Sequence, residues 1–174
     1  MIFKDRQDAG ERLADLVVKK VQGIGLVLGI PRGGVVVAKI VADKLNWPLD
    51  ILAAKKIGAP GNPELAVGAK VKPPAPQLVK KLRQVKQVIL VDDGIATGYT
   101  MEAGIKYLQG QSLKVIVAVP VAAQDSAERL KKIADQWFCV YEADNLMAIG
   151  QFYEEFSQVS DEEVAELLNK LLEE

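Results

Sequence analysis

The sequence predicts one doubly wound α/β domain, in which a parallel β-sheet is covered by helices on both faces. Short runs that are apolar at every position alternate with segments that are apolar on one helical face, and this alternation is typical of such a sheet. The length of 174 residues suits a single domain. Hydrophobic residues make up 49% and charged residues 26%, as in an ordinary globular protein.

The first half of the chain predicts strands and helices separated by glycine- and proline-rich breaks. In order, we expect a helix over 8–23 ending at Gly23, a strand over 25–30, a helix over 35–45, a strand over 49–56, a loop over 57–64, an extended piece over 65–71 and a short basic helix over 77–86. The helices follow from apolar residues at helical spacing, and the strands from short apolar runs. Glycine and proline content defines the loop, and the "KPPAP" run at 72–76 breaks regular structure and is the expected join between the core and a peripheral lobe.

The second half continues the alternation more regularly. Strands are expected over 87–91, 113–121 and 137–143, with helices over 100–110, 125–134 and 160–174. The last helix begins with Ser160 three residues before Glu163, which is the spacing of a capping box.

Composition excludes several classes of site. The 22 basic and 23 acidic residues nearly balance, so no broad nucleic-acid surface is expected. The chain has no histidine and one cysteine, Cys139, so histidine-based catalysis, common zinc sites and disulfide frameworks are excluded. No apolar run has membrane-spanning length, and the N-terminus lacks a signal-peptide core. We expect a cytoplasmic protein with no membrane contact, and a homodimer remains open.

The stretch "VILVDDGIATGYT" carries the main functional signal. Asp92 and Asp93 follow a buried strand, at the edge where open parallel sheets bind ligands. Unpaired carboxylates there need hydroxyl donors, backbone N–H groups or a cation. Gly94 and Gly98 allow unusual backbone conformations, and a helix that starts near Gly98 offers free N–H groups to an anion. The pattern predicts a phosphate cradle beside a diol-binding carboxylate pair.

These thirteen residues closely resemble the ribose-phosphate signature of the type I phosphoribosyltransferases. "GIPRGGVVVA", "KKIGAPGNPELAVGA" and "QFYEEFSQVSDEE" are similar to a bacterial and archaeal subgroup usually described only by that family name. The resemblance implies that Asp92 and Asp93 hold the ribose hydroxyls of phosphoribosyl pyrophosphate. The loop that holds the 5-phosphate would then consist of Ala96, Thr97, Gly98, Tyr99 and Thr100.

The resemblance also gives "GIPRGG" the role of a pyrophosphate loop, often built with a non-proline cis peptide. Gly33 and Gly34 allow close backbone approach to an anion, and Arg32 offers a fork of donors. Lys55 and Lys56 end the expected strand at the same edge, and we favour Lys56 as the pyrophosphate contact. An ordinary turn and a solvated strand end are the alternatives.

The implied architecture is a single phosphoribosyltransferase-like domain over 1–174, with 58–87 as a cover loop and a reduced hood over the base. Glu64 is the candidate acidic contact of the cover loop, and a plain long loop is the alternative. Phe152, Tyr153 and Phe156 either stack on a base or pack internally.

The implied activity transfers ribose 5-phosphate to a nitrogenous base or amine and releases pyrophosphate. Mg²⁺, which prefers oxygen ligands, would bridge the pyrophosphate and ribose near Asp92 and Asp93. The 6-oxopurine enzymes place an acid where this chain has Ala96, so guanine and hypoxanthine are poor candidates unless Glu64 or Glu142 substitutes. The acceptor stays open.

Two other functions remain. The same site would suit a regulatory protein that senses phosphoribosyl pyrophosphate or a nucleotide, and an unrelated α/β phosphate-binding enzyme is a third reading.

Overall fold

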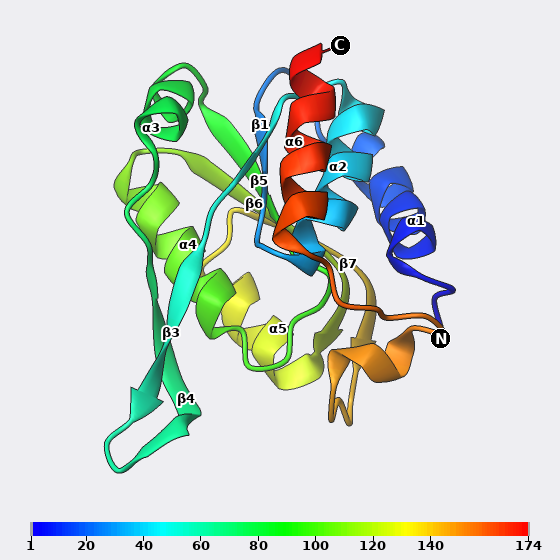
Figure 1. The fold of residues 1–174 in the computed structure, drawn as a ribbon, viewed down its shortest axis with the longest axis vertical. Helices are drawn as coiled ribbons and strands as arrows, with labels where there is room; N and C mark the ends of the chain where they lie inside the picture. Colours follow the sequence, from blue (N-terminus) through cyan, green and yellow to red (C-terminus); the bar gives the residue numbers. More distant parts are fainter. Residues whose placement is uncertain (1, 174) are drawn as a thin grey trace.

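The computed structural model describes residues 2–173, with side chains for all of these except 64–65 and 170–173. Along the chain lie α1 (Arg6–Val18), β1 (Leu26–Gly29), α2 (Gly33–Leu45), β2 (Leu49–Ile51), β3 (Ala54–Ala59), β4 (Asn62–Val71), α3 (Pro76–Arg83), β5 (Gln87–Val91), α4 (Tyr99–Gly110), β6 (Lys114–Ala123), α5 (Gln124–Lys131), β7 (Gln136–Ala143), the short 3₁₀ helix η1 (Ile149–Phe152) and α6 (Asp161–Glu173) (Figure 1).

Five strands form one parallel sheet in the order β2-β1-β5-β6-β7. Successive side chains of an extended strand point to opposite faces of the sheet. Because helices cover both faces, the side chains of the central strands are buried on either side. Leu90 packs among the helices of one face, and the neighbouring Ile89 packs among those of the other. This arrangement confirms the doubly wound α/β fold predicted from the apolar runs.

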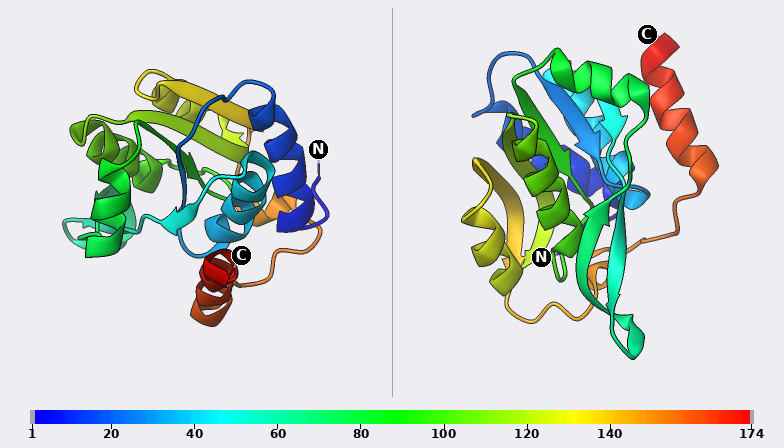
Figure 2. Two further views of the ribbon diagram at one scale, coloured as in Figure 1. Left: turned by 90° about the horizontal axis from the view of Figure 1, so that it is seen from above. Right: turned by 90° about the vertical axis from the view of Figure 1, so that its left-hand side faces the viewer.

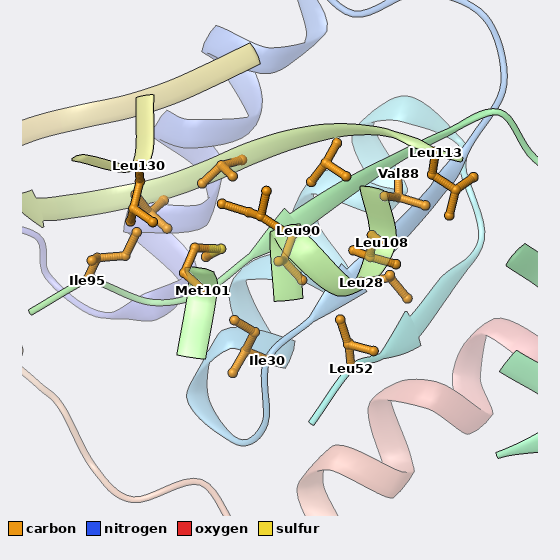
Figure 3. Close-up of a cluster of buried hydrophobic side chains, with 14 of the residues drawn as sticks. Leu28, Ile30, Leu52, Val88, Leu90, Ile95, Met101, Leu108, Leu113 and Leu130 are labelled. Carbon is orange, nitrogen blue, oxygen red and sulfur yellow. The ribbon is translucent and has the colours of Figure 1, made fainter. Parts of the chain in front are cut away.

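Each face of the sheet has its own hydrophobic core. Side chains of α3, α4 and α5 cover one face, where Leu28, Leu90 and Met101 lie in a single buried cluster (Figure 3). Helices α1, α2 and α6 lie over the other face (Figure 1), and their side chains form the buried cluster there. The expected boundaries were wrong at α1, which ends at Val18 rather than at Gly23. The capping box is confirmed at α6, where the Glu163 N–H donates to Ser160 Oγ over 3.1 Å.

The strand order fixes where a ligand would bind. From β1 the chain goes outward to β2, and it then returns to the opposite side of β1 to form β5. The loops after β1 and β5 therefore diverge onto different faces, and they leave a crevice between the carboxyl ends of these strands. Such a switch point is the usual ligand site of an open α/β sheet.

The strand expected over 49–56 was wrong, because this segment belongs to two elements. Residues of β2 pair with β1, whereas Ala54 begins β3, which leaves the sheet and pairs antiparallel with β4. The loop expected over 57–64 is accordingly part of a β-hairpin that projects beyond the body of the domain (Figure 2). The alternating strand pattern is weak in "AKKIGA", where Lys55 and Lys56 interrupt the apolar run between Ala54 and Ile57.

The segment after the "KPPAP" break returns to the core. The α3 side chains of Leu78 and Leu82 are buried against the sheet, and Lys81 Nζ lies 2.9 Å from Asp50 Oδ2.

In residues 2–173, no helix is both long enough and apolar enough to cross a bilayer.

Candidate functional site

Two loops meet at the switch point. The first follows β1, and its Ile30 N–H donates to Val91 O at the end of β5 over 2.9 Å. This loop contains a cis peptide between Pro31 and Arg32, as the sequence resemblance implied. It leads into α2 without a side-chain cap, so the first turn of this helix presents N–H groups that no side chain satisfies.

The second loop follows β5 and leads into α4. Gly98 occupies the N-cap position with φ 80°, a left-handed conformation that glycine adopts without steric cost, and no side chain caps this helix either. Both predicted anion loops therefore end at the N-terminus of a helix with free donors. The positive ends of these helix dipoles favour negative charge at the same edge of the sheet.

Asp92 lines a pocket of about 750 Å³ between the two loops. The other lining residues are Ile30, Pro31, Ala54, Lys55, Lys56, Lys72 and Thr100. Burial raises the pKa of Asp92 well above its usual range, and the adjacent Asp93 carboxylate raises it further, while Lys56 acts in the opposite direction. A carboxylate held under these conditions gains from a cation or from hydroxyl donors.

Asp93 is held in place by an ion pair through its side chain and by a hydrogen bond through its backbone carbonyl. Its Oδ2 lies 2.9 Å from Arg6 Nε, and its backbone carbonyl accepts a 2.6 Å hydrogen bond from the Tyr153 hydroxyl. Arg6 was missed from the sequence, because nothing in "FKDR" indicates a partner 87 residues away. Tyr153 was noted only as an aromatic residue, and its ring packs 4.8 Å from that of Phe156.

The loop over 95–100 is anchored by β6 and α5. Ile95 N–H donates to Val121 O over 2.9 Å, and Ser126 Oγ donates to Ala96 O over 2.6 Å. Arg129 donates to Thr97 O over 2.5 Å, and its guanidinium carbon lies 5.6 Å from the centre of the Tyr99 ring. The carbonyl groups of the loop are thus turned toward the protein, which favours N–H groups facing the crevice.

Three glycines of the predicted site are required by close packing. A Cβ at Gly33 would lie 2.1 Å from Asp93 Oδ2, and one at Gly34 would lie 2.8 Å from Asp92 Oδ1. The loop after β1 therefore rests directly on the two carboxylates. Gly94 likewise has no room for a side chain, since a Cβ there would lie 2.5 Å from Ile149 Cγ2.

The predicted basic residues reach the site from separate elements. Lys55 and Lys56 lie in β3, at the base of the hairpin, and both line the pocket. Arg32 is half-exposed, and its Nη1 lies 3.9 Å from Asp161 Oδ1 at the start of α6. The structure thus brings Lys56, Asp92 and Thr100 around one pocket. Arg32 belongs to the loop after β1, which also lines this pocket, and its side chain lies near the start of α6.

A second hollow of about 570 Å³ lies at the carboxyl ends of β6 and β7. Its lining includes Asp125, Glu128 and Asp144, and Asp125 directly precedes the Ser126 that holds Ala96. Glu142 is engaged elsewhere, 2.6 Å from Lys131 Nζ. The Glu64 side chain lies outside the described residues.

A metal site made of protein groups alone does not occur in the described part of the chain, where no three acidic or cysteine side chains converge. Asp92 at the pocket and its neighbour Asp93 fit a hard cation such as Mg²⁺ that takes its remaining ligands from phosphate oxygens and water.

The chain is similar to known proteins both in sequence and in fold. The family model of the phosphoribosyl transferase domain matches residues 4–156. Two Mycobacterium tuberculosis proteins, each named "Putative phosphoribosyl transferase", are 33% identical to the chain over 207 residues, covering 97% of this chain and 47% of each relative. The chain thus spans about half the length of these curated relatives.

Solved structures extend the comparison. TT1426 from Thermus thermophilus is 35% identical, with a TM-score of 0.81 over 98% of this chain and 99% of its own. A Neisseria gonorrhoeae protein crystallised with bound ppGpp is 15% identical, with a TM-score of 0.63 over 98% of both chains, which shows a shared fold.

Proposed function

Because the chain belongs to the phosphoribosyl transferase domain family, we propose that it transfers ribose 5-phosphate from phosphoribosyl pyrophosphate to a nitrogenous base or amine, with release of pyrophosphate. The observation that carries this proposal is the pocket at the switch point, where Lys56, Asp92 and Thr100 meet between two uncapped helix N-termini. A ligand with a diphosphate, a diol and a further phosphate matches this site, because the two helix N-termini suit the phosphates and Asp92 suits the diol.

Each part of the ligand has a place in the proposed complex. The pyrophosphate would lie against the α2 N-terminus, with Arg32, Gly33 and Gly34 of its loop and Lys56 from the hairpin. Asp92 and Asp93 would accept hydrogen bonds from the ribose hydroxyls. The 5-phosphate would be bound by Ala96, Thr97, Gly98, Tyr99 and Thr100, where backbone N–H groups and two threonine hydroxyls are available.

The proposed reaction breaks the bond between ribose C1 and a pyrophosphate oxygen, which keeps the electron pair. The acceptor nitrogen forms the new bond to C1 and then loses its proton. Positive charge on the sugar and negative charge on the leaving group develop together, so positioning and electrostatic stabilisation suffice. Arg32, Lys56 and the α2 dipole would stabilise the negative charge on the leaving group. The Asp92 carboxylate would stabilise the positive charge that develops on the ribose.

Asp92, with Asp93 behind it, would hold Mg²⁺, and the bound ion would neutralise charge on the pyrophosphate oxygens. The residues themselves would orient the ribose and keep the diol fixed. The β3–β4 hairpin is suited to exclude water, since its base lines the pocket and its arm carries the exposed side chains of Ile57 and Val67.

The acceptor would occupy space near Ala96, beside the hollow that contains Asp125 and Asp144. Ala96 provides no carboxylate for a 6-oxopurine, so a site that lacks this polar contact should select weakly for hypoxanthine or guanine. Adenine, a pyrimidine or a small amine is the better candidate, and a base as acceptor would place the protein in nucleotide salvage.

A regulatory role is the second candidate. The Neisseria gonorrhoeae fold neighbour binds ppGpp, which carries a ribose and two diphosphates, so this fold accommodates a ligand of related chemistry. A sensor of phosphoribosyl pyrophosphate or of a nucleotide would use the same loops without turnover.

A pyrophosphate-release assay with Mg²⁺ and phosphoribosyl pyrophosphate tests the proposal against adenine, guanine, hypoxanthine, uracil, orotate and small amines. The transferase reading expects release with at least one acceptor, and little with guanine or hypoxanthine. Asp92→Asn is the control, and it should abolish the signal. Binding of phosphoribosyl pyrophosphate without turnover of any acceptor would favour the sensor. No binding of phosphoribosyl pyrophosphate at all would contradict both the transferase and the sensor.

A further inference from the structure

Arg6 links the first helix to the candidate site. It begins α1, and its guanidinium Nε lies 2.9 Å from Asp93 Oδ2. Its Nη1 donates to Ser157 O over 2.6 Å, and its guanidinium carbon lies 4.0 Å from the centre of the Phe156 ring. The side chain is only 12% exposed. Arg6 is thus fixed by three groups, one in the loop after β5 and two in the segment before α6.

The contact with Arg6 leaves one oxygen of Asp93 available. Oδ2 is used by Arg6, whereas Oδ1 has no hydrogen bond among the described residues. No buried side-chain oxygen in that part of the chain lacks a partner. Because Oδ1 has no partner, it cannot be one of the buried oxygens, and it is accessible to solvent although Asp93 as a whole is buried. A free acceptor oxygen next to Asp92 is what a second hydroxyl of a diol requires.

Charge explains why an arginine is needed. Asp92 and Asp93 are adjacent carboxylates, and without compensation their repulsion and burial would drive Asp93 toward another position. The planar fork of arginine can bond Asp93 and Ser157 at the same time, which the single ammonium group of lysine does less well. The Gly33 backbone packs on this pair, and a Cβ there would lie 2.7 Å from Arg6 Nε. Arg6 therefore packs against both loops of the candidate site, at Gly33 after β1 and at Asp93 after β5.

We propose that Arg6 is a positioning residue for the diol contact: it holds Asp93 Oδ2 so that Oδ1 faces a ribose hydroxyl, and it does not itself touch the ligand. This inference rests on the proposed ribose-phosphate site and adds a residue to it. Loss of Arg6 should weaken recognition of the diol more than recognition of the phosphate.

Ribose 5-phosphate and 2-deoxyribose 5-phosphate provide a matched pair of probes, because they share the phosphate and differ in one hydroxyl of the diol. Their dissociation constants are measured by calorimetry with Mg²⁺ on the full chain and on Arg6→Met. The wild-type chain should bind the ribose compound about tenfold more tightly, as expected for the loss of one hydrogen bond to a charged group. In Arg6→Met this preference should fall below about threefold.

Arg12→Met is the control, since Arg12 also lies on α1, but its acidic partner is Asp8 and its aromatic partner is Phe3, neither of which belongs to the candidate site. It should keep the wild-type preference. Arg6→Lys, which retains the charge, should give an intermediate preference and serves if Arg6→Met does not fold.

The outcomes separate the two levels of the proposal. Equal weakening of both sugars in Arg6→Met, with the preference retained, would show a purely structural role and overturn the positioning of Asp93. A wild-type chain that binds both sugars equally would do the same. Failure of the wild-type chain to bind either sugar would overturn the ribose-phosphate site itself, and with it the role of Arg6.

Discussion

The Tyr153 hydroxyl donates a 2.6 Å hydrogen bond to the backbone carbonyl of Asp93, 60 residues earlier in the chain. Tyr153 itself is buried in a small cluster with Phe3, Val121 and Ala143. The second carboxylate of the site is therefore fixed through its backbone by the C-terminal segment and through its side chain by α1. The site depends on parts of the chain that carry none of its recognisable motif.

Tyr153→Phe should destabilise the fold by about 1–3 kcal/mol, because the Asp93 carbonyl would be left buried without a donor. Urea unfolding measures the change. Tyr141→Phe is the control, since the Tyr141 hydroxyl has no hydrogen bond within the described residues and the side chain is partly exposed. Equal stability of Tyr153→Phe and the wild-type chain would show that this hydrogen bond does not hold the loop.

The two carboxylates should respond in opposite directions to neutralisation. Burial and the neighbouring charge raise the pKa of Asp92, so Asp92→Asn should increase the free energy of unfolding at neutral pH by about 1 kcal/mol. Asp93→Asn should lower it by about 2–3 kcal/mol, because Arg6 would lose its partner in a site that is 12% exposed. Urea unfolding of both variants is the measurement. A stabilising Asp93→Asn would contradict the importance of the ion pair.

Gly33→Ala should cost about 1–3 kcal/mol by overpacking, since the new methyl group would lie 2.1 Å from Asp93 Oδ2. Gly68→Ala is the matched control, because nothing lies within 4 Å of a Cβ at that position of β4. Thermal unfolding of the two variants gives the comparison. Equal melting temperatures would mean that the loop after β1 does not rest on the carboxylates as described.

Cys139 should react slowly with thiol reagents in the folded chain. Burial raises the pKa of its thiol to about 12, so at pH 8 the thiolate is rarer than in a free cysteine by roughly 1,000-fold. The stability that comes from the protonated thiol is full below about pH 8.5 and is lost as the pH rises toward about 12. Modification of this single cysteine with Ellman's reagent, with and without urea, is the test. Equal rates in both conditions would contradict the protection expected from its partial burial.

The fold and the core of the site were predictable because they depend on local patterns. Apolar runs gave the sheet, and "DDGIATGYT" gave an anion loop between β5 and α4. The β3–β4 hairpin was not predictable in the same way, since Lys55 and Lys56 follow an apolar run that continues from β2 without a clear break.

The partners of Asp93 were equally out of reach of sequence patterns. Arg6 lies 87 residues away and Tyr153 lies 60 residues away, and no local periodicity relates either residue to the motif. The sequence predicted Asp92 and Asp93 only as a diol-binding pair. The position of Arg6 beside one of them makes the two carboxylates unequal.

The most direct test of the central claim is calorimetric binding of phosphoribosyl pyrophosphate in the presence of Mg²⁺, measured on the wild-type chain and on Asp92→Asn. We expect saturable binding with one site per chain, and a loss of affinity of at least about tenfold in the variant, although the variant should be the more stable protein. Undetectable binding to the wild-type chain, or equal affinity for both proteins, would contradict the assignment of the pocket at Asp92 as the ribose-phosphate site.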